Sequence, residues 1–160
     1  TRFMQVLSQL LTPGRTVCRA SGVSKKRMLQ TIAGIIADDQ LSLDAAEVFS
    51  QLIAREKLGS TGLGQGIAIP HCRIDNCSHP LGTLVTLEDG VPFDAPDGED
   101  VDLLFVLLVP SEAHQEHLDI LAELARLFSQ ASFCRELRAA TDSEALYQLA
   151  TGWNATERAG

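Results

Sequence analysis

The apolar run at residues 101–109 constrains the fold more than any other part of the sequence. Every position of this run except Asp102 carries an aliphatic or aromatic side chain. A run without polar alternation predicts a central strand whose two faces are both covered. Such a strand needs a layer of structure on each side of its sheet, so the run favours an α/β fold.

Other segments predict the remaining strands. Residues 16–18 predict a short edge strand, and residues 67–69 and 81–88 predict two further strands. The predicted strands are interspersed with predicted helices along the chain, and the sequence contains no internal repeat and no linker. We therefore expect a single α/β domain over residues 1–155, a mixed β-sheet flanked by helices on both faces, with a flexible tail at residues 156–160.

Helices are predicted by apolar side chains at helical spacing and by residues suited to N-caps. In chain order the predicted helices are a short segment closed by Pro13-Gly14, a helix capped by Ser24, a helix capped by Ser42 that ends before Gly59, a helix over residues 118–128, and two short helices capped by Ser132 and by Asp142 or Ser143. Arg55 falls in the last turn of the helix that Ser42 is predicted to cap.

Charge and composition narrow the classes of function. Asp and Glu number 21 against 13 Lys and Arg, and the net charge of −8 argues against binding a phosphate backbone. No apolar run approaches the roughly 18 residues of a membrane span, and no basic-then-apolar leader opens the chain, so we expect no membrane insertion and a cytoplasmic protein. The four cysteines are then expected to be reduced thiols.

His71 is the first candidate for chemistry. It follows the predicted strand at residues 67–69, where Pro70 interrupts the ladder. Open α/β sheets hold ligands beyond the ends of their strands. Neutral imidazole is nucleophilic near pH 7 and forms a phosphoramidate that passes its phosphoryl group onward. His71 is therefore a candidate phosphoryl acceptor.

Neighbouring residues fit the same chemistry. The guanidinium of Arg55 suits phosphoryl oxygens, and His117 begins the helix after the central strand, from where it can reach the same cleft. The glycine-rich segment at residues 59–66 offers backbone N–H groups and two hydroxyls to an anion. The predicted phosphoryl-binding residues of this segment are Ser60, Thr61, Gly62, Gly64 and Gly66.

The segment at residues 55–71, REKLGSTGLGQGIAIPH, resembles the active-site segment of the fructose/mannitol class of enzyme IIA domains in the bacterial phosphotransferase system. Residues 92–95 and 101–105, and the Leu-Val-Pro before the His117 helix, are also similar to this family. The resemblance covers nearly the whole chain and is strongest to the stand-alone nitrogen-regulatory members. The chain departs from many members at Cys72, which stands where they have Gly.

The resemblance implies a phosphotransferase-system component with a phosphohistidine intermediate and no independent small-molecule turnover. It implies that His71 is phosphorylated, that Arg55 assists, and that His117 is the second active-site histidine. It further implies, as donor, the HPr-like histidine phosphocarrier of the nitrogen branch of this system (NPr), and downstream regulated proteins such as potassium transport systems. No metal or organic cofactor is expected.

Three alternatives remain at this point. A separate sugar-specific IIA unit would carry the same residues but pass phosphate to a IIB domain. A binding module would use surfaces that ignore His71. A metal-binding module would draw on residues with loosely zinc-like spacing, namely His71, Cys72, Cys77 and His79, or the helical pair His114 and His117. Against the metal site, adjacent residues such as His71 and Cys72 point apart in an extended chain.

Cys72 raises one further hypothesis. A thiol beside a phosphate-binding segment would have a lowered pKa and would be open to oxidation. The other reading is an ordinary packed thiol, which is also what we expect for Cys18 and Cys134.

Overall fold

A six-stranded mixed sheet forms the centre of the protein. The computed structural model describes residues 5–22, 24–113 and 115–153, so His114 and the expected tail at residues 156–160 lie outside it. In chain order the elements are α1 (Gln5–Leu10), the 3-10 turn η2 (Pro13–Arg15), β1 (Thr16–Ala20), α2 (Lys25–Asp39), α3 (Ala45–Glu56), β2 (Gly62–Gly64), β3 (Ile67–Ala68), β4 (His71–Ile74), β5 (Leu81–Val91), β6 (Val101–Pro110), α4 (Gln115–Phe128), α5 (Ala131–Ala139) and α6 (Ser143–Gly152).

Strand β6, the apolar run of the sequence, lies inside the sheet as predicted. The strand order is β1-β5-β6-β3-β2, and β4 also pairs with β6. Strand β5 runs antiparallel to β6, whereas β3 and β4 run parallel to it. Strand β1 lies at one edge, parallel to β5, in agreement with the predicted edge strand at residues 16–18.

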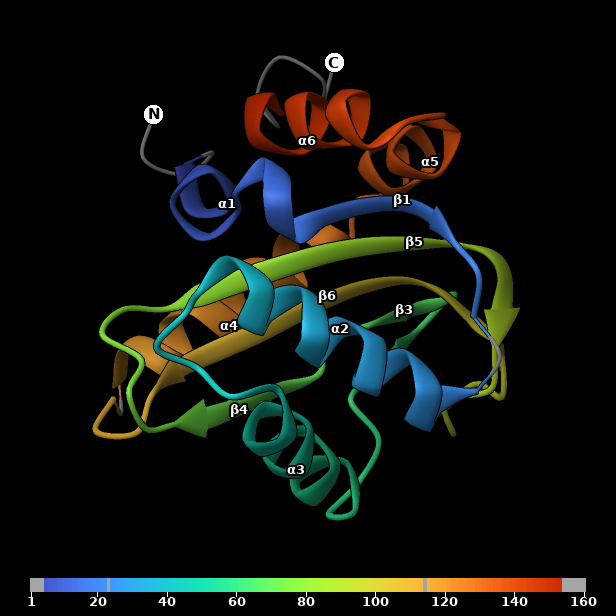
Figure 1. The fold of residues 1–160 in the computed structure, drawn as a ribbon. Helices are drawn as coiled ribbons and strands as arrows, with labels where there is room; N and C mark the ends of the chain where they lie inside the picture. The colour runs from blue at the N-terminus through green and yellow to red at the C-terminus, as the bar shows by residue number, and fades with distance from the viewer. Residues whose placement is uncertain (1–4, 23, 114, 154–160) are drawn as a thin grey trace.

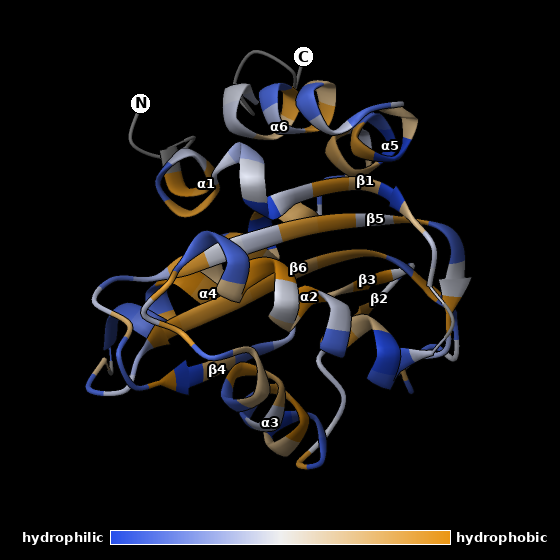
Figure 2. Cartoon of the chain, viewed as in Figure 1, coloured by the Kyte–Doolittle hydropathy of each residue, from blue (hydrophilic) through white to orange (hydrophobic). Residues whose placement is uncertain are grey.

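The two faces of the sheet are buried against different helices, which confirms the predicted layers (Figure 1). On one face, Leu104, Val106 and Leu108 of β6 pack with apolar residues of α2 and α3. On the other, the alternate residues Leu103, Phe105 and Leu107 pack with α1, α4, α5 and α6. Figure 2 shows the apolar colour of β5 and β6 continuing through the middle of the molecule. None of the helices in the described part of the chain has the length and apolar character needed to cross a bilayer.

Helix starts test the predicted caps. The side chain of Ser24 accepts a hydrogen bond from Arg27 N at 3.1 Å and caps α2, as predicted. Of the two caps proposed for α6, Asp142 is the one observed, and its carboxylate accepts from Ala145 N at 2.8 Å.

Two predicted caps are wrong. The N-cap of α3 is Asp44, whose carboxylate accepts from Glu47 N at 3.0 Å, whereas Ser42 donates its hydroxyl to the Asn76 carbonyl. Helix α5 begins at Ala131 and not after Ser132. For α3 two capping residues, Ser42 and Asp44, lie close together in the sequence, so the local pattern did not decide which one is used. Helix α5 has Gln130 at its N-cap and no side-chain capping bond, so its start left no capping signal in the sequence.

The edge of the sheet next to β6 carries a break that determines where His71 lies. Strand β3 pairs Ile67 with Leu103, and β4 pairs His71 with Leu107, so both strands run along one side of β6. Pro70, between them, has no N–H to donate, but its carbonyl accepts from Leu107 N at 2.9 Å. The predicted strand ends before Pro70, yet the chain returns to the sheet at once, and His71 is the first residue of β4.

Candidate functional site

The ring of His71 is held by a neighbouring backbone carbonyl. Its Nδ1 lies 2.8 Å from the carbonyl oxygen of Ile69. A carbonyl oxygen only accepts hydrogen bonds, so Nδ1 of the neutral ring carries the proton and Nε2 carries the free electron pair. The geometry therefore leaves Nε2 as the ring nitrogen with an available electron pair.

Strand β4 directs His71 and Arg73 to the same face of the sheet. Cys72 and Ile74 point into the core formed with α2 and α3. Because side chains alternate along a strand, His71 and Arg73 project to the opposite face, the one on which α4 packs. No role was expected for Arg73, because the predicted strand ends before Pro70 and the alternation of β4 could not be read from the sequence.

Helix α4 brings the second histidine to His71. The ring centroids of His71 and His117 are 5.5 Å apart, with the planes at 62°, an edge-to-face arrangement. His117 is 9% exposed, and its Nδ1 is buried without a hydrogen-bond partner among the described residues. The structure thus brings together the two histidines that the sequence analysis paired.

Arg55 completes the group from the last turn of α3. One of its guanidinium nitrogens, Nη1, donates to the Gly59 carbonyl at 2.8 Å, which fixes the side chain at the end of the helix. The side chains of both arginines and both histidines, Arg55, Arg73, His71 and His117, line one pocket of about 360 Å³. It is lined by Gln51, Ala54, Arg55, Leu58, His71, Cys72, Arg73 and His117.

The surroundings lower the pKa of both histidines. For His71, desolvation by burial lowers the pKa below 6.5 most strongly; the bond to Ile69 raises it, and the positive charge of Arg55 lowers it further. For His117, burial lowers the pKa first, followed by the positive charges of His71, Arg73 and Arg55. Both rings are therefore neutral near pH 7, which is the protonation state that a nitrogen nucleophile requires.

Ser60 and Thr61 lie near this group, but their hydroxyls are engaged elsewhere. The hydroxyl of Ser60 donates to the Phe93 carbonyl at 2.6 Å and accepts from Gly62 N at 3.1 Å. The hydroxyl of Thr61 donates to the carboxylate of Glu56. Neither residue lines the pocket that holds His71.

The predicted phosphoryl contacts Gly62, Gly64 and Gly66 also lie outside that pocket. Gly62 pairs with Ala68 across the β2–β3 hairpin and approaches Ala95 closely. Ile67 and His71 are four register positions apart on β6, or about 13 Å at 3.3 Å per residue, and the hairpin turn lies beyond Ile67.

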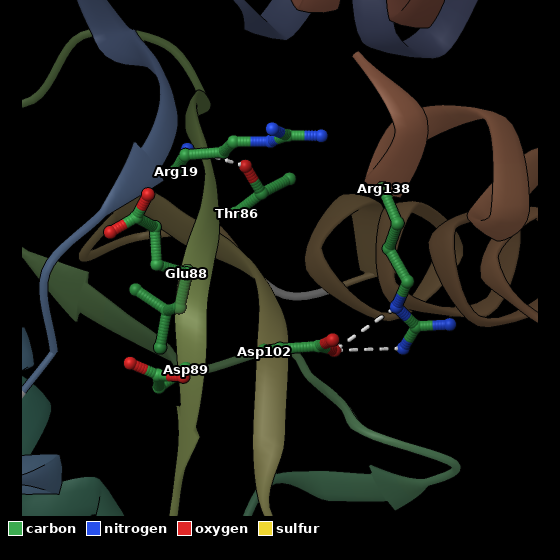
Figure 3. A pocket seen from close by; sticks show the side chains of 7 residues that line it. Arg19, Thr86, Glu88, Asp89, Asp102 and Arg138 are labelled. Carbon is green, nitrogen blue, oxygen red and sulfur yellow. Dashed lines mark hydrogen bonds and ion pairs between the residues drawn. The ribbon is translucent and has the colours of Figure 1, made fainter. Parts of the chain in front are cut away.

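Backbone conformation and close charged neighbours explain why the hairpin turn contains glycine, since Gly64 and Gly66 have φ +94° and +81°. Arg138 donates to Asp102 from Nε at 3.0 Å and forms an ion pair with it through Nη2 at 2.9 Å (Figure 3). Arg138 also donates to the Gln65 carbonyl, and a Cβ on Gly66 would lie 2.9 Å from its Nη2. Gly64 faces the carboxylate of Asp97. These carboxylates make the hairpin turn a poor environment for a phosphoryl group.

The structure bears on two hypotheses about the cysteines, a lowered pKa of Cys72 and a metal site. Burial, with a smaller contribution from Cys77, raises the pKa of Cys72 to about 12, so the lowered pKa considered from the sequence is wrong. Cys72 is a buried member of the core cluster formed with α2 and α3, and it also borders the pocket that holds His71. Among the described residues, no three His, Cys, Asp or Glu side chains are grouped to hold a metal ion.

The family of the chain follows from a match over most of its length. Residues 9–151 match the family described as "Phosphoenolpyruvate-dependent sugar phosphotransferase system, EIIA 2". The chain belongs to the EIIA 2 family. The resemblance stated from the sequence is thereby confirmed.

Relatives of this EIIA 2 protein include nitrogen-regulatory ones. A nitrogen regulatory protein of Pseudomonas aeruginosa is 50% identical over 143 residues, covering 89% of this chain and 93% of that protein. The crystal structure of nitrogen regulatory protein IIA-Ntr from Neisseria meningitidis matches with a TM-score of 0.84 and 40% identity, covering 91% of this chain and 99% of that one. The mannitol enzyme IIA, solved in complex with phosphorylated enzyme IIB from Escherichia coli, shares the fold with a TM-score of 0.73 and 17% identity, over 89% and 98% of the chains.

Proposed function

We propose that this EIIA 2 protein is a phosphoryl carrier in which Nε2 of His71 accepts a phosphoryl group from a histidine phosphocarrier protein of the HPr type. The observation that carries the proposal is the 2.8 Å contact between Nδ1 of His71 and the Ile69 carbonyl. It keeps the proton on Nδ1 and leaves the Nε2 electron pair free for attack. The match over residues 9–151 supports taking residues 1–155 as the IIA domain.

The chemical step needs little from the protein beyond this ring and nearby positive charge. The phosphorus–nitrogen bond of the donor breaks, its electron pair returns to the donor nitrogen, and the Nε2 electron pair of His71 forms the new bond. Arg55 and Arg73 offset the negative charge on the phosphoryl oxygens, and His117 lies beside the acceptor ring. No metal or organic cofactor is required for this exchange.

The surface around the pocket suits another protein as the donor. Leu58 lines the pocket and is 85% exposed, and Leu118, the neighbour of His117, is 58% exposed. Exposed apolar side chains around a reactive group favour protein docking over capture of a small molecule. Arg55 and Arg73 favour a partner with acidic groups at the edge of its contact surface.

The relatives support a regulatory role within this chemistry. The Pseudomonas aeruginosa and Neisseria meningitidis proteins are named nitrogen regulatory proteins. We propose that the phosphorylated and free forms act in the cytoplasm on regulated proteins, such as potassium transport systems. Phosphorylation adds a charge of about −2 beside Leu58 and Leu118, enough to change the affinity of a partner docked there.

Labelling with phosphoenolpyruvate tests the carrier function. The protein is incubated with the upstream carriers and labelled phosphoenolpyruvate, and acid-labile label is mapped to a residue. We expect the label on His71, none in the variant His71→Ala, and full labelling of His79→Ala, a matched control because His79 is exposed and lies outside the pocket. Label on another residue, or full labelling of His71→Ala, would reject the assignment.

Sugar uptake is the second candidate function, and the shared fold with the mannitol enzyme IIA is the observation in its favour. The same labelled protein discriminates between the two. Rapid loss of the label to a sugar-specific IIB domain would support uptake. Retention of the label, with different partner binding by the free and labelled forms, would support regulation.

A further inference from the structure

Glu56, the last residue of α3, is a buried carboxylate with several donors around it. Its side chain is 4% exposed and forms an ion pair with Lys25 Nζ at 2.9 Å. It also accepts from the hydroxyl of Thr61 and, at 3.3 Å, from Thr61 N. A buried carboxylate is costly without such partners, so this arrangement holds Thr61 in one place relative to α3.

Thr61 is connected to His71 through the backbone. Its carbonyl accepts from Ile69 N at 3.1 Å. The carbonyl of the same Ile69 residue lies 2.8 Å from Nδ1 of His71. Two hydrogen bonds therefore separate the residue held by Glu56 from the imidazole ring, and each has normal length.

We propose that Glu56 and Thr61 are positioning residues that determine which nitrogen of His71 carries the proton. The inference rests on the proposed function, since it concerns the same ring, and it gives Thr61 a different role from the phosphoryl contact expected from the sequence. Thr61 holds Ile69, and Ile69 holds the proton on Nδ1.

The physical basis is the angular requirement of the bond to Ile69. A hydrogen bond weakens steeply as its angle falls below about 120°. If Ile69 N loses its anchor on Thr61, the Ile69–Pro70 peptide can rotate and turn its carbonyl away from Nδ1. A neutral ring without this bond exchanges between its two tautomers. In the tautomer with the proton on Nε2, that nitrogen has no electron pair for attack. Loss of the Thr61 hydroxyl therefore lowers the fraction of competent rings without removing any group from the pocket.

Three substitutions separate this role from others. Thr61→Val keeps the shape and removes the hydroxyl, Thr61→Ser restores a hydroxyl, and Glu56→Gln removes the charge that pairs with Lys25. The matched control is Thr83→Val, because the hydroxyl of Thr83 is fully buried in the same sheet and has no partner among the described residues. Amide spectra of each variant establish that it is folded.

The readout is the 15N NMR spectrum of the His71 ring at a pH where the ring is neutral. We expect one tautomer, with Nδ1 protonated, in the protein without substitutions, in Thr61→Ser and in Thr83→Val. We expect a mixture of both tautomers in Thr61→Val and Glu56→Gln. The rate of phosphorylation should then fall at least in proportion to the fraction of rings that lose the Nδ1 proton.

Each outcome decides the proposal. Unchanged ring spectra in folded Thr61→Val and Glu56→Gln would overturn it, whatever their phosphorylation rates. A slower Thr61→Val with an unchanged tautomer would instead assign the hydroxyl to contact with the phosphoryl group. If the tautomers shift as expected but His71 of the unmodified protein takes no label from active upstream carriers, the positioning role stands and the proposed function fails.

Discussion

Substituting Gly66 by Ala distinguishes a packing role of the glycine-rich hairpin from a phosphoryl-binding one. Gly66 has φ +81°, a left-handed conformation that costs a residue with a Cβ about 1–2 kcal/mol. The new Cβ would also lie 2.9 Å from Nη2 of Arg138 and 3.0 Å from Asp102, and loss of this part-exposed ion pair costs up to about 1 kcal/mol. Together we expect the free energy of unfolding to fall by about 1–3 kcal/mol.

Thermal unfolding and labelling measure the two expectations for Gly66→Ala. In a protein of this size, about 1–3 kcal/mol corresponds to a melting temperature lower by roughly 2–12 °C. Below that transition the phosphorylation rate should match that of the unmodified protein, because Gly66 lies beyond Ile67, on the far side of β3 from His71.

The control for Gly66→Ala is Gly34→Ala. Gly34 lies inside α2, and a Cβ there would meet nothing within 4 Å, so this variant should gain about 0.5–1 kcal/mol. A stable Gly66→Ala with a severalfold slower phosphorylation would refute the reasoning, because it would mean that the hairpin turn contacts the phosphoryl group.

Three further results are expected. Arg73→Ala should slow phosphorylation by roughly two- to fivefold, because an exposed cation contributes modestly to binding the phosphoryl group. The effect should be larger at low salt than at high salt, since salt screens the charge. An unchanged rate at low salt would exclude Arg73 from the site. NMR titration should give pKa values below 6.5 for His71 and His117, and values above 6.5 would contradict the expectation. Because the unfolded chain then binds more protons than the folded one, the free energy of unfolding should fall as the pH drops below about 6.5. Cys72 should react slowly with iodoacetamide at neutral pH, since it is buried with a pKa of about 12; alkylation at the rate of a free thiol would show otherwise.

The sequence predicted the layers of the fold because burial leaves a direct periodic trace. The apolar run at residues 101–109 predicted a doubly covered strand, and β6 is covered on both faces. Helix α2 begins after Ser24, as its cap predicted. Ser42 was a wrong cap because Asp44, two residues later, offers an equally good acceptor and is the one used, while Ser42 donates to the distant Asn76 carbonyl.

Residue type and place in the chain were enough to group His71 with Arg55 and His117, which line one pocket. Arg73 was missed because the predicted strand ended before Pro70, so the alternation of β4 that places Arg73 on the same face as His71 was not expected. The glycine-rich segment was assigned to the phosphoryl group because it immediately precedes His71 in the sequence. It forms the β2–β3 hairpin, whose turn carries Gly64 and Gly66 away from His71, and nothing local in the sequence gives the direction of a hairpin.

The interrupted strand has a consequence for protein engineering. Within residues 69–73, the Ile69 carbonyl fixes the His71 ring, and Pro70 separates β3 from β4. Arg73 lies on the same face of β4 as His71. Residues 71–73 pair with a single parallel neighbour, β6, and Ile69 is held by the Thr61 carbonyl. Grafting this segment onto the exposed parallel edge of an unrelated scaffold would therefore require a backbone acceptor in the place of Thr61 as well as the neighbouring strand.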